Sequence, residues 1–144
     1  TIALPKAGEY RLEIKGECLL QAGPEAPLLI EASVTHPADI ESSGPLYFYV
    51  PKGVKQIFVT ASPRFSYFVP GIAGARAASP VDRVAGQDYV AIDVPTGADG
   101  QLWHSSDLSR GKVSFLNIPP YFCFNRAAVA VPREVAEADG LTTR

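Results

Sequence analysis

The sequence predicts an all-β fold, an antiparallel β-sandwich of jelly-roll or Greek-key type with seven to eight strands and at most one short C-terminal helix. Two observations support this prediction. Short runs of β-branched and aromatic residues recur along the chain, and turns containing proline or glycine separate them. Hydrophobic residues make up 47% of the 144 residues and charged residues 19%, so a well-filled core is expected without a metal or a disulfide.

We expect residues 1–144 to form a single β-sandwich domain that is a fragment or processed product of a larger protein. The chain starts at Thr1, contains no methionine and shows no charged-then-apolar leader. The formal net charge is −2, and lysines and arginines are scattered singly. We therefore expect no nucleic-acid partner, and the lack of an 18-residue apolar run predicts no membrane span.

The most informative stretch is Leu46 to Thr60, LYFYVPKGVKQIFVT. Its two apolar, β-prone runs are Leu46 to Val50 and Val54 to Thr60, with only Pro51-Lys52-Gly53 between them. Proline fixes φ at the first turn position and glycine accepts a positive φ, so three residues suffice to reverse the chain. The pattern predicts a β-hairpin.

Alternation within this stretch divides its side chains between two faces. One face carries the apolar residues that we assign to the core, with two counterparts on the returning strand: Leu46, Phe48, Val50, Ile57 and Val59. Tyr47 and Tyr49 then share the opposite, outer face.

The remaining strands follow the same period of two. The clearest is Glu9 to Lys15 (EYRLEIK), in which Tyr10, Leu12 and Ile14 occupy one face. Further strands are expected at Leu28 to Val34, Phe65 to Val69, Tyr89 to Val94, Gln101 to Ser105 and Lys112 to Ile118.

Less regular segments complete the chain. Thr35 to Gly44 is expected to be a loop, and Ser62 to Gln87 a strand followed by a long surface connection. Short edge segments are expected at Tyr121 to Phe124 and Ala127 to Val131. Pro132 to Ala138 predicts a helix of one or two turns that Gly140 ends.

Candidate chemistry in the sequence is sparse, and we predict no catalytic residue and no enzyme activity. The run His104-Ser105-Ser106-Asp107 contains the residue types of a catalytic triad, but neighbours on a strand point to opposite faces. His36 and His104 are the only histidines and form no spaced cluster, so no metal and no cofactor are expected. Asp93 and Asp99 offer oxygen ligands for calcium, although an Asp-Gly turn is the more common reading.

The two cysteines, Cys18 and Cys123, lie far apart in the sequence. They form either one disulfide between the two ends of the chain or two buried thiols. A single pair is a weak sign of an oxidising compartment, so the sequence leaves both alternatives open.

Aromatic residues are the remaining candidates for a binding site. Tyr47 and Tyr49 on one strand face offer flat amphipathic rings on which a sugar can stack, and Trp103 is a third candidate. The strand phase of Trp103 is undecided, because Leu102 and His104 are an equally acceptable outward pair. The alternative is that these rings pack inside the sandwich, as strand aromatics commonly do.

The stretch LYFYVPKGVKQIFVT, together with VPTGADGQLWHSSDLSRGKVSFLNIPPYF and the following VPRE, resembles bacterial pre-peptidase C-terminal-like modules and related sandwich domains at the C-termini of large secreted proteins. The resemblance implies a non-catalytic accessory module, secreted or at the cell surface, without a cofactor. Its partner would be a polysaccharide, bound weakly, or an adjoining catalytic domain. A hydrolase domain is a distant third reading.

Overall fold

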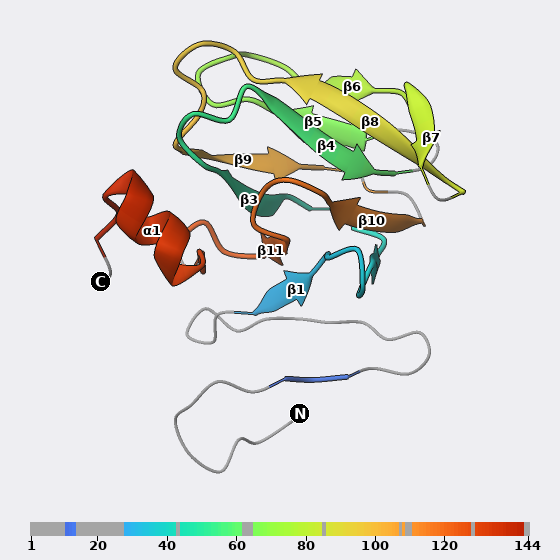
Figure 1. Cartoon of the computed structure of the whole chain (residues 1–144), viewed down its shortest axis with the longest axis horizontal. Helices are drawn as coiled ribbons and strands as arrows, with labels where there is room; N and C mark the ends of the chain where they lie inside the picture. Colours follow the sequence, from blue (N-terminus) through green and yellow to red (C-terminus); the bar gives the residue numbers. More distant parts are fainter. Residues whose placement is uncertain are drawn as a thin grey trace.

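The computed structural model describes residues 11–13, 28–42, 44–61, 65–84, 86–106, 108, 111–127 and 129–142 (Figure 1). These residues contain eleven strands in two antiparallel sheets. The six-stranded sheet has the order β1 (Leu29–Glu31), β11 (Tyr121–Cys123), β3 (Leu46–Val50), β9 (Gln101–Ser105), β5 (Phe65–Phe68) and β6 (Arg76–Ala78). The five-stranded sheet has the order β2 (Ala38–Asp39), β10 (Lys112–Phe115), β4 (Gln56–Thr60), β8 (Gln87–Asp93) and β7 (Asp82–Val84).

The strand order confirms the all-β sandwich and identifies its connectivity. With β5, β6 and β7 set aside, eight strands remain along the described chain. Numbered in sequence, they run first, eighth, third, sixth in one sheet and second, seventh, fourth, fifth in the other, which is the interleaved order of a jelly roll. The strands β5 to β7 are an insertion that extends both sheets, so the structure has more strands than the seven to eight predicted.

The predicted hairpin at Pro51-Lys52-Gly53 is wrong in its pairing, although both strands form. β3 pairs with β9 and β11, whereas β4 pairs with β8 and β10 in the other sheet. The connection therefore crosses from one sheet to the other. Gly53 has a φ of 81°, and its N–H donates to the Asp99 carboxylate at 2.8 Å. Proline and glycine specify that the chain turns, but the distant strands decide which partner each strand takes.

The core lies between the two sheets, and the predicted core residues are all buried there. Leu46, Phe48, Val50, Ile57 and Val59 are each at most 1% exposed. Phe48 is central, with its ring centroid 5.0 to 6.3 Å from those of Phe65, Trp103, Phe115 and Phe122. Such aromatic contacts add to the stabilisation from burial and fix the spacing of the sheets.

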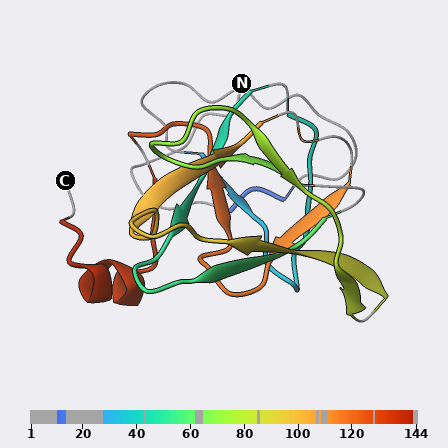
Figure 2. The same cartoon turned by 90° about the horizontal axis from the view of Figure 1, so that it is seen from above.

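The helix α1 (Arg133–Asp139) confirms the prediction for the C-terminal segment and ends at Gly140, whose φ is 67°. It lies at one end of the sandwich (Figures 1 and 2). Its last residue, Asp139, is 6% exposed and accepts hydrogen bonds from the Tyr49 hydroxyl at 2.7 Å and from the Lys52 N–H at 2.9 Å. One buried carboxylate therefore attaches the helix both to β3 and to the crossing that follows it.

Several boundaries differ from the sequence predictions. β1 covers only part of the segment Leu28 to Val34, β2 forms inside the expected loop Thr35 to Gly44, and the described residues of Ala127 to Val131 form no strand. No described helix combines the length and apolar character needed to cross a bilayer.

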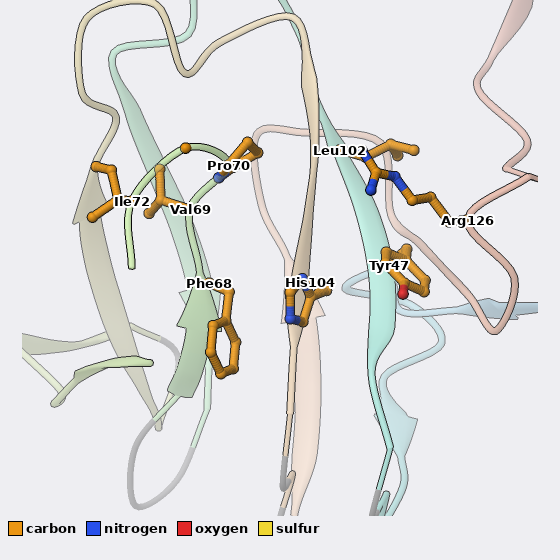
Figure 3. Close-up of a pocket in the computed structure, with 9 residues that line it drawn as sticks. Tyr47, Phe68, Val69, Pro70, Ile72, Leu102, His104 and Arg126 are labelled. Carbon is orange, nitrogen blue, oxygen red and sulfur yellow. The ribbon is translucent and has the colours of Figure 1, made fainter. Parts of the chain in front are cut away.

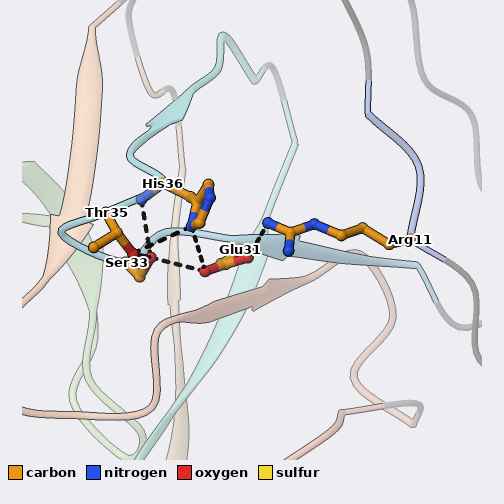
Figure 4. Close-up of polar contacts among 5 residues, drawn as sticks. All are labelled: Arg11, Glu31, Ser33, Thr35 and His36. Carbon is orange, nitrogen blue, oxygen red and sulfur yellow. Dashed lines mark hydrogen bonds and ion pairs between the residues drawn. The ribbon is translucent and has the colours of Figure 1, made fainter.

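Of the predicted strand Glu9 to Lys15, only Arg11–Glu13 lie within the described residues, and they are not in a strand. Leu12 is 50% exposed, so it does not face the core as predicted. Arg11 donates to the Glu31 carboxylate at 3.1 Å, which links this segment to β1 (Figure 4). Cys123 is a buried free thiol whose pKa is raised by burial, and Cys18 lies outside the described residues.

Candidate functional site

Three rings from neighbouring strands line up on the outer face of the six-stranded sheet. Tyr47 on β3 is the cross-strand partner of His104 on β9, and His104 is the partner of Phe68 on β5. All three side chains are partly exposed. Period-two alternation places them outward, because their neighbours Phe48, Trp103 and Tyr67 point into the core. We call Tyr47, His104 and Phe68 the ring row.

The rings of the ring row differ in orientation. Phe68 and His104 stack with centroids 4.5 Å apart and planes 11° apart, so each covers one face of the other. Tyr47 lies 5.5 Å from His104 and is tilted by 52°, so the imidazole does not cover its face in parallel. The stack fixes the position of His104, while the tilted phenol leaves an apolar surface beside it.

A pocket of about 310 Å³ opens over the ring row (Figure 3). Apolar side chains contribute much of its wall, and Arg126 reaches into it from the segment after β11. The lining residues are Tyr47, Phe68, Val69, Pro70, Gly71, Ile72, Leu102, His104 and Arg126. Its volume is at the lower end of the range for small-molecule sites. One wall, residues 68–72, comes from the insertion that extends the jelly roll.

Three polar groups at this pocket have no hydrogen-bond or ion-pair partner among the described residues: the Tyr47 hydroxyl, the His104 ring nitrogens and the Arg126 guanidinium. Burial lowers the pKa of His104, and the nearby positive charge of Arg126 lowers it further. His104 is therefore neutral at pH 7, with one ring nitrogen as donor and the other as acceptor. An apolar wall with a few convergent polar groups is the usual composition of a ligand site.

Of the three predicted binding residues, the structure places only Tyr47 on the open surface. Trp103 is fully buried: its indole N–H donates to the Ala98 carbonyl at 2.8 Å, and its ring stacks on Tyr67. The phase of β9, which the sequence left undecided, makes Leu102 and His104 the outward pair, so Trp103 is not accessible as a binding residue.

Tyr49 shares the outer face with Tyr47, as predicted, but it is only 5% exposed. Its hydroxyl is engaged by Asp139, and its pKa is raised by burial and by this carboxylate. The tyrosine therefore serves to hold α1 on the sheet and is not accessible to a ligand. The sequence pattern of the strand could not show this, because the residue is buried by tertiary contact with α1, a helix from the end of the chain.

The candidate catalytic and metal residues do not assemble into such sites. His104 and Ser105 point to opposite faces of β9, as alternation predicts, and Asp107 lies outside the described residues. Asp93 accepts a hydrogen bond from Gln56, and Asp99 accepts one from Gly53. Within the described ranges, no group of three or more His, Cys, Asp or Glu side chains is arranged to hold a metal ion.

A second polar cluster surrounds Glu31, and it also lacks the geometry of a proton relay (Figure 4). The Thr35 hydroxyl and the Glu31 carboxylate both contact Nδ1 of His36, each at 3.2 Å. A relay needs the hydroxyl and the carboxylate on different ring nitrogens. Ser33 donates to Glu31, and this bond is the main cause of the lowered pKa of that carboxyl. The cluster stabilises the turn after β1.

Sequence reasoning missed Phe68 and Arg126 and did not assign His104 to a binding site. The outward position of Phe68 could have been predicted from alternation. Phe65 and Tyr67 are the inward pair of the strand and leave Phe68 on the opposite face. Arg126 had no such signal, since it follows a short strand and stands alone.

Comparisons with protein-family models, with curated proteins and with solved structures give no match to this chain.

Proposed function

We propose that this domain is a non-catalytic carbohydrate-binding module that binds polysaccharide at the ring row. The observation that carries the proposal is the convergence of an open phenol face, an apolar wall and unpaired hydrogen-bonding groups on one patch of a sheet. A pyranose ring has an apolar face that stacks on aromatic rings and hydroxyls that need polar partners.

Each element of the site has a place in this proposal. The face of Tyr47 is the stacking platform, and the Tyr47 hydroxyl and neutral His104 supply donors and acceptors to sugar hydroxyls. Phe68 holds the imidazole by stacking on it. The residues rest on three paired strands, so little ordering is required on binding. The secreted or cell-surface location and the resemblance to accessory sandwich modules are part of the same proposal.

The test is binding of a polysaccharide panel by affinity electrophoresis and isothermal titration calorimetry. Tyr47→Ala is expected to weaken binding about 5- to 150-fold, because stacking on one ring is worth about 1–3 kcal/mol by analogy with bases on aromatic side chains. Phe68→Ala is expected to weaken binding as well, because it removes the ring that holds His104 in place. Tyr89→Ala is the matched control, since Tyr89 is a partly exposed aromatic residue on the outer face of the other sheet. Wild type without affinity for any glycan, or equal binding by all three variants, would refute the proposal.

A second candidate function is docking on an adjoining catalytic domain without any sugar ligand. It is favoured by an apolar group on the outer face of the five-stranded sheet, where Phe58 and Tyr89 are in edge contact and neighbouring Leu116 is 40% exposed. In this case Tyr89→Ala and Leu116→Asp would weaken association with that domain, while Tyr47→Ala would not.

A further inference from the structure

The charge at the pocket suggests which polysaccharides the ring row accepts. Arg126 is the one charged side chain among the described residues that line it, since His104 is neutral, and no carboxylate is among these residues. Three other described arginines pair with carboxylates: Arg11 with Glu31, Arg83 with Asp88 and Arg133 with Glu137, at 3.1, 2.9 and 2.7 Å. Arg126 has no such partner in the described part of the chain.

From this charge we infer that the ring row selects anionic polysaccharide, with Arg126 as the residue that recognises the carboxylate or sulfate group. The inference rests on the carbohydrate-binding function proposed above. A guanidinium presents two parallel N–H donors whose geometry matches a carboxylate or a sulfate, and such charge-assisted pairs are stronger than neutral hydrogen bonds.

The position of Arg126 supports this role. In Figure 3 its side chain enters the pocket on the side of Tyr47 and Leu102, opposite the loop that carries Val69 and Pro70. The positive charge of Arg126 is close enough to His104 to help lower the pKa of the imidazole. A sugar ring stacked on Tyr47 would thus have the guanidinium at its edge, where the acidic substituent of a pyranose lies.

The C-terminal segment brings Arg126 to this place. β11 pairs with β3 at Tyr47, and Arg126 lies three residues after the last residue of β11. Further along the same segment, Asp139 is attached to Tyr49 and Lys52 on and beside β3. Arg126 therefore lies in a segment that is attached beside Tyr47 at one end and to Tyr49 and Lys52 at the other, which restricts where the guanidinium can reach.

The experiment compares pairs of ligands that share one sugar backbone and differ in charge. Oligogalacturonate and its methyl ester form one pair, and dextran sulfate and dextran form a second pair that separates sulfate from carboxylate as the source of the charge. Wild type is expected to bind each anionic member about 3- to 10-fold more tightly than its neutral partner at 50 mM NaCl. This range is below that of a buried charged pair, because Arg126 is exposed and water screens its charge. This preference should shrink at 500 mM NaCl as the charges are screened.

Variants of Arg126 test whether this residue causes the preference for anionic ligands. Arg126→Gln should remove the preference, and Arg126→Lys should restore part of it, because an ammonium keeps the charge but not the paired donors. Arg76→Gln is the matched control, since Arg76 is an exposed arginine on β6 at the far edge of the same sheet.

The outcomes distinguish this inference from the proposed function. Equal binding of charged and neutral ligands that still depends on Tyr47, or an unchanged preference in Arg126→Gln, would overturn the inference alone. Loss of the preference in Arg76→Gln to the same extent would also overturn it, because general charge would then be the cause. Wild type that binds none of the four ligands or any other glycan would overturn both.

Discussion

The hydrogen bond between Tyr49 and Asp139 should be a main determinant of the stability of the C-terminal helix. The hydroxyl and the carboxylate oxygen are 2.7 Å apart, and both side chains are at most 6% exposed. Tyr49→Phe removes the hydroxyl. The Asp139 side chain then keeps the hydrogen bond from the Lys52 N–H and loses the other of its two described hydrogen bonds. A hydrogen bond to a charged group contributes about 1.5–3 kcal/mol to the free energy of unfolding.

This loss should lower Tm by about 5–10 °C for a domain of this size. We would measure it by urea unfolding followed by circular dichroism, with Asp139→Ala and the double variant completing a thermodynamic cycle. Because each single variant already removes the hydrogen bond between Tyr49 and Asp139, the double variant should destabilise the domain by about 1–2 kcal/mol less than the sum of the two single effects. Tyr89→Phe is the control and should change stability by less than about 0.5 kcal/mol. Additive single effects, or a Tyr49→Phe variant as stable as wild type, would refute the reasoning.

Two further predictions concern the titration of Tyr49 and the burial of Trp103. Folding raises the pKa of Tyr49, so its contribution to stability is complete below the unfolded pKa of about 10 and is lost as the pH rises above that value. The free energy of unfolding should therefore fall less between pH 9 and 11 in Tyr49→Phe than in wild type. An equal fall in the two proteins would contradict this prediction. Trp103 is the single tryptophan, so its fluorescence should resist acrylamide quenching and stay unchanged when a glycan binds. Trp103→Phe should cost about 2–4 kcal/mol, because it leaves a cavity and an unpaired Ala98 carbonyl.

The sequence was sufficient to predict the longer strands that have one buried face, but it did not predict the two-residue strand β2, whose Ala38 is buried. Phe48 and Ile57 lie in runs whose alternation is set by the core, and the predicted strand Leu46 to Val50 agrees with the structure residue by residue. The predicted hairpin failed because pairing is a property of distant segments. β9 takes the place beside β3 that β4 would have had, and no local pattern records that choice.

The candidate site was predictable only in part for the same reason. Tyr47 and Tyr49 are equivalent in strand phase, yet α1 covers one and leaves the other open. For Trp103 the strand phase itself was ambiguous, and the stack on Tyr67 together with the bond to Ala98 decides it. Arg126 could not be found from the sequence, because its place at the pocket depends on the pairing of β11 with β3, which no local pattern records.

The crossing at Pro51-Lys52-Gly53 also has a consequence for synthesis on the ribosome. The central strand β3 forms its two pairings with β9 and β11, both made much later in translation. Until they emerge, the apolar residues of β3 have no sheet partner, and a chain ending before Trp103 cannot complete the middle of its larger sheet. Folding must therefore wait for nearly the whole domain and proceed slowly, as is usual when contacts are distant in sequence. The incomplete chain is the species that needs protection from aggregation.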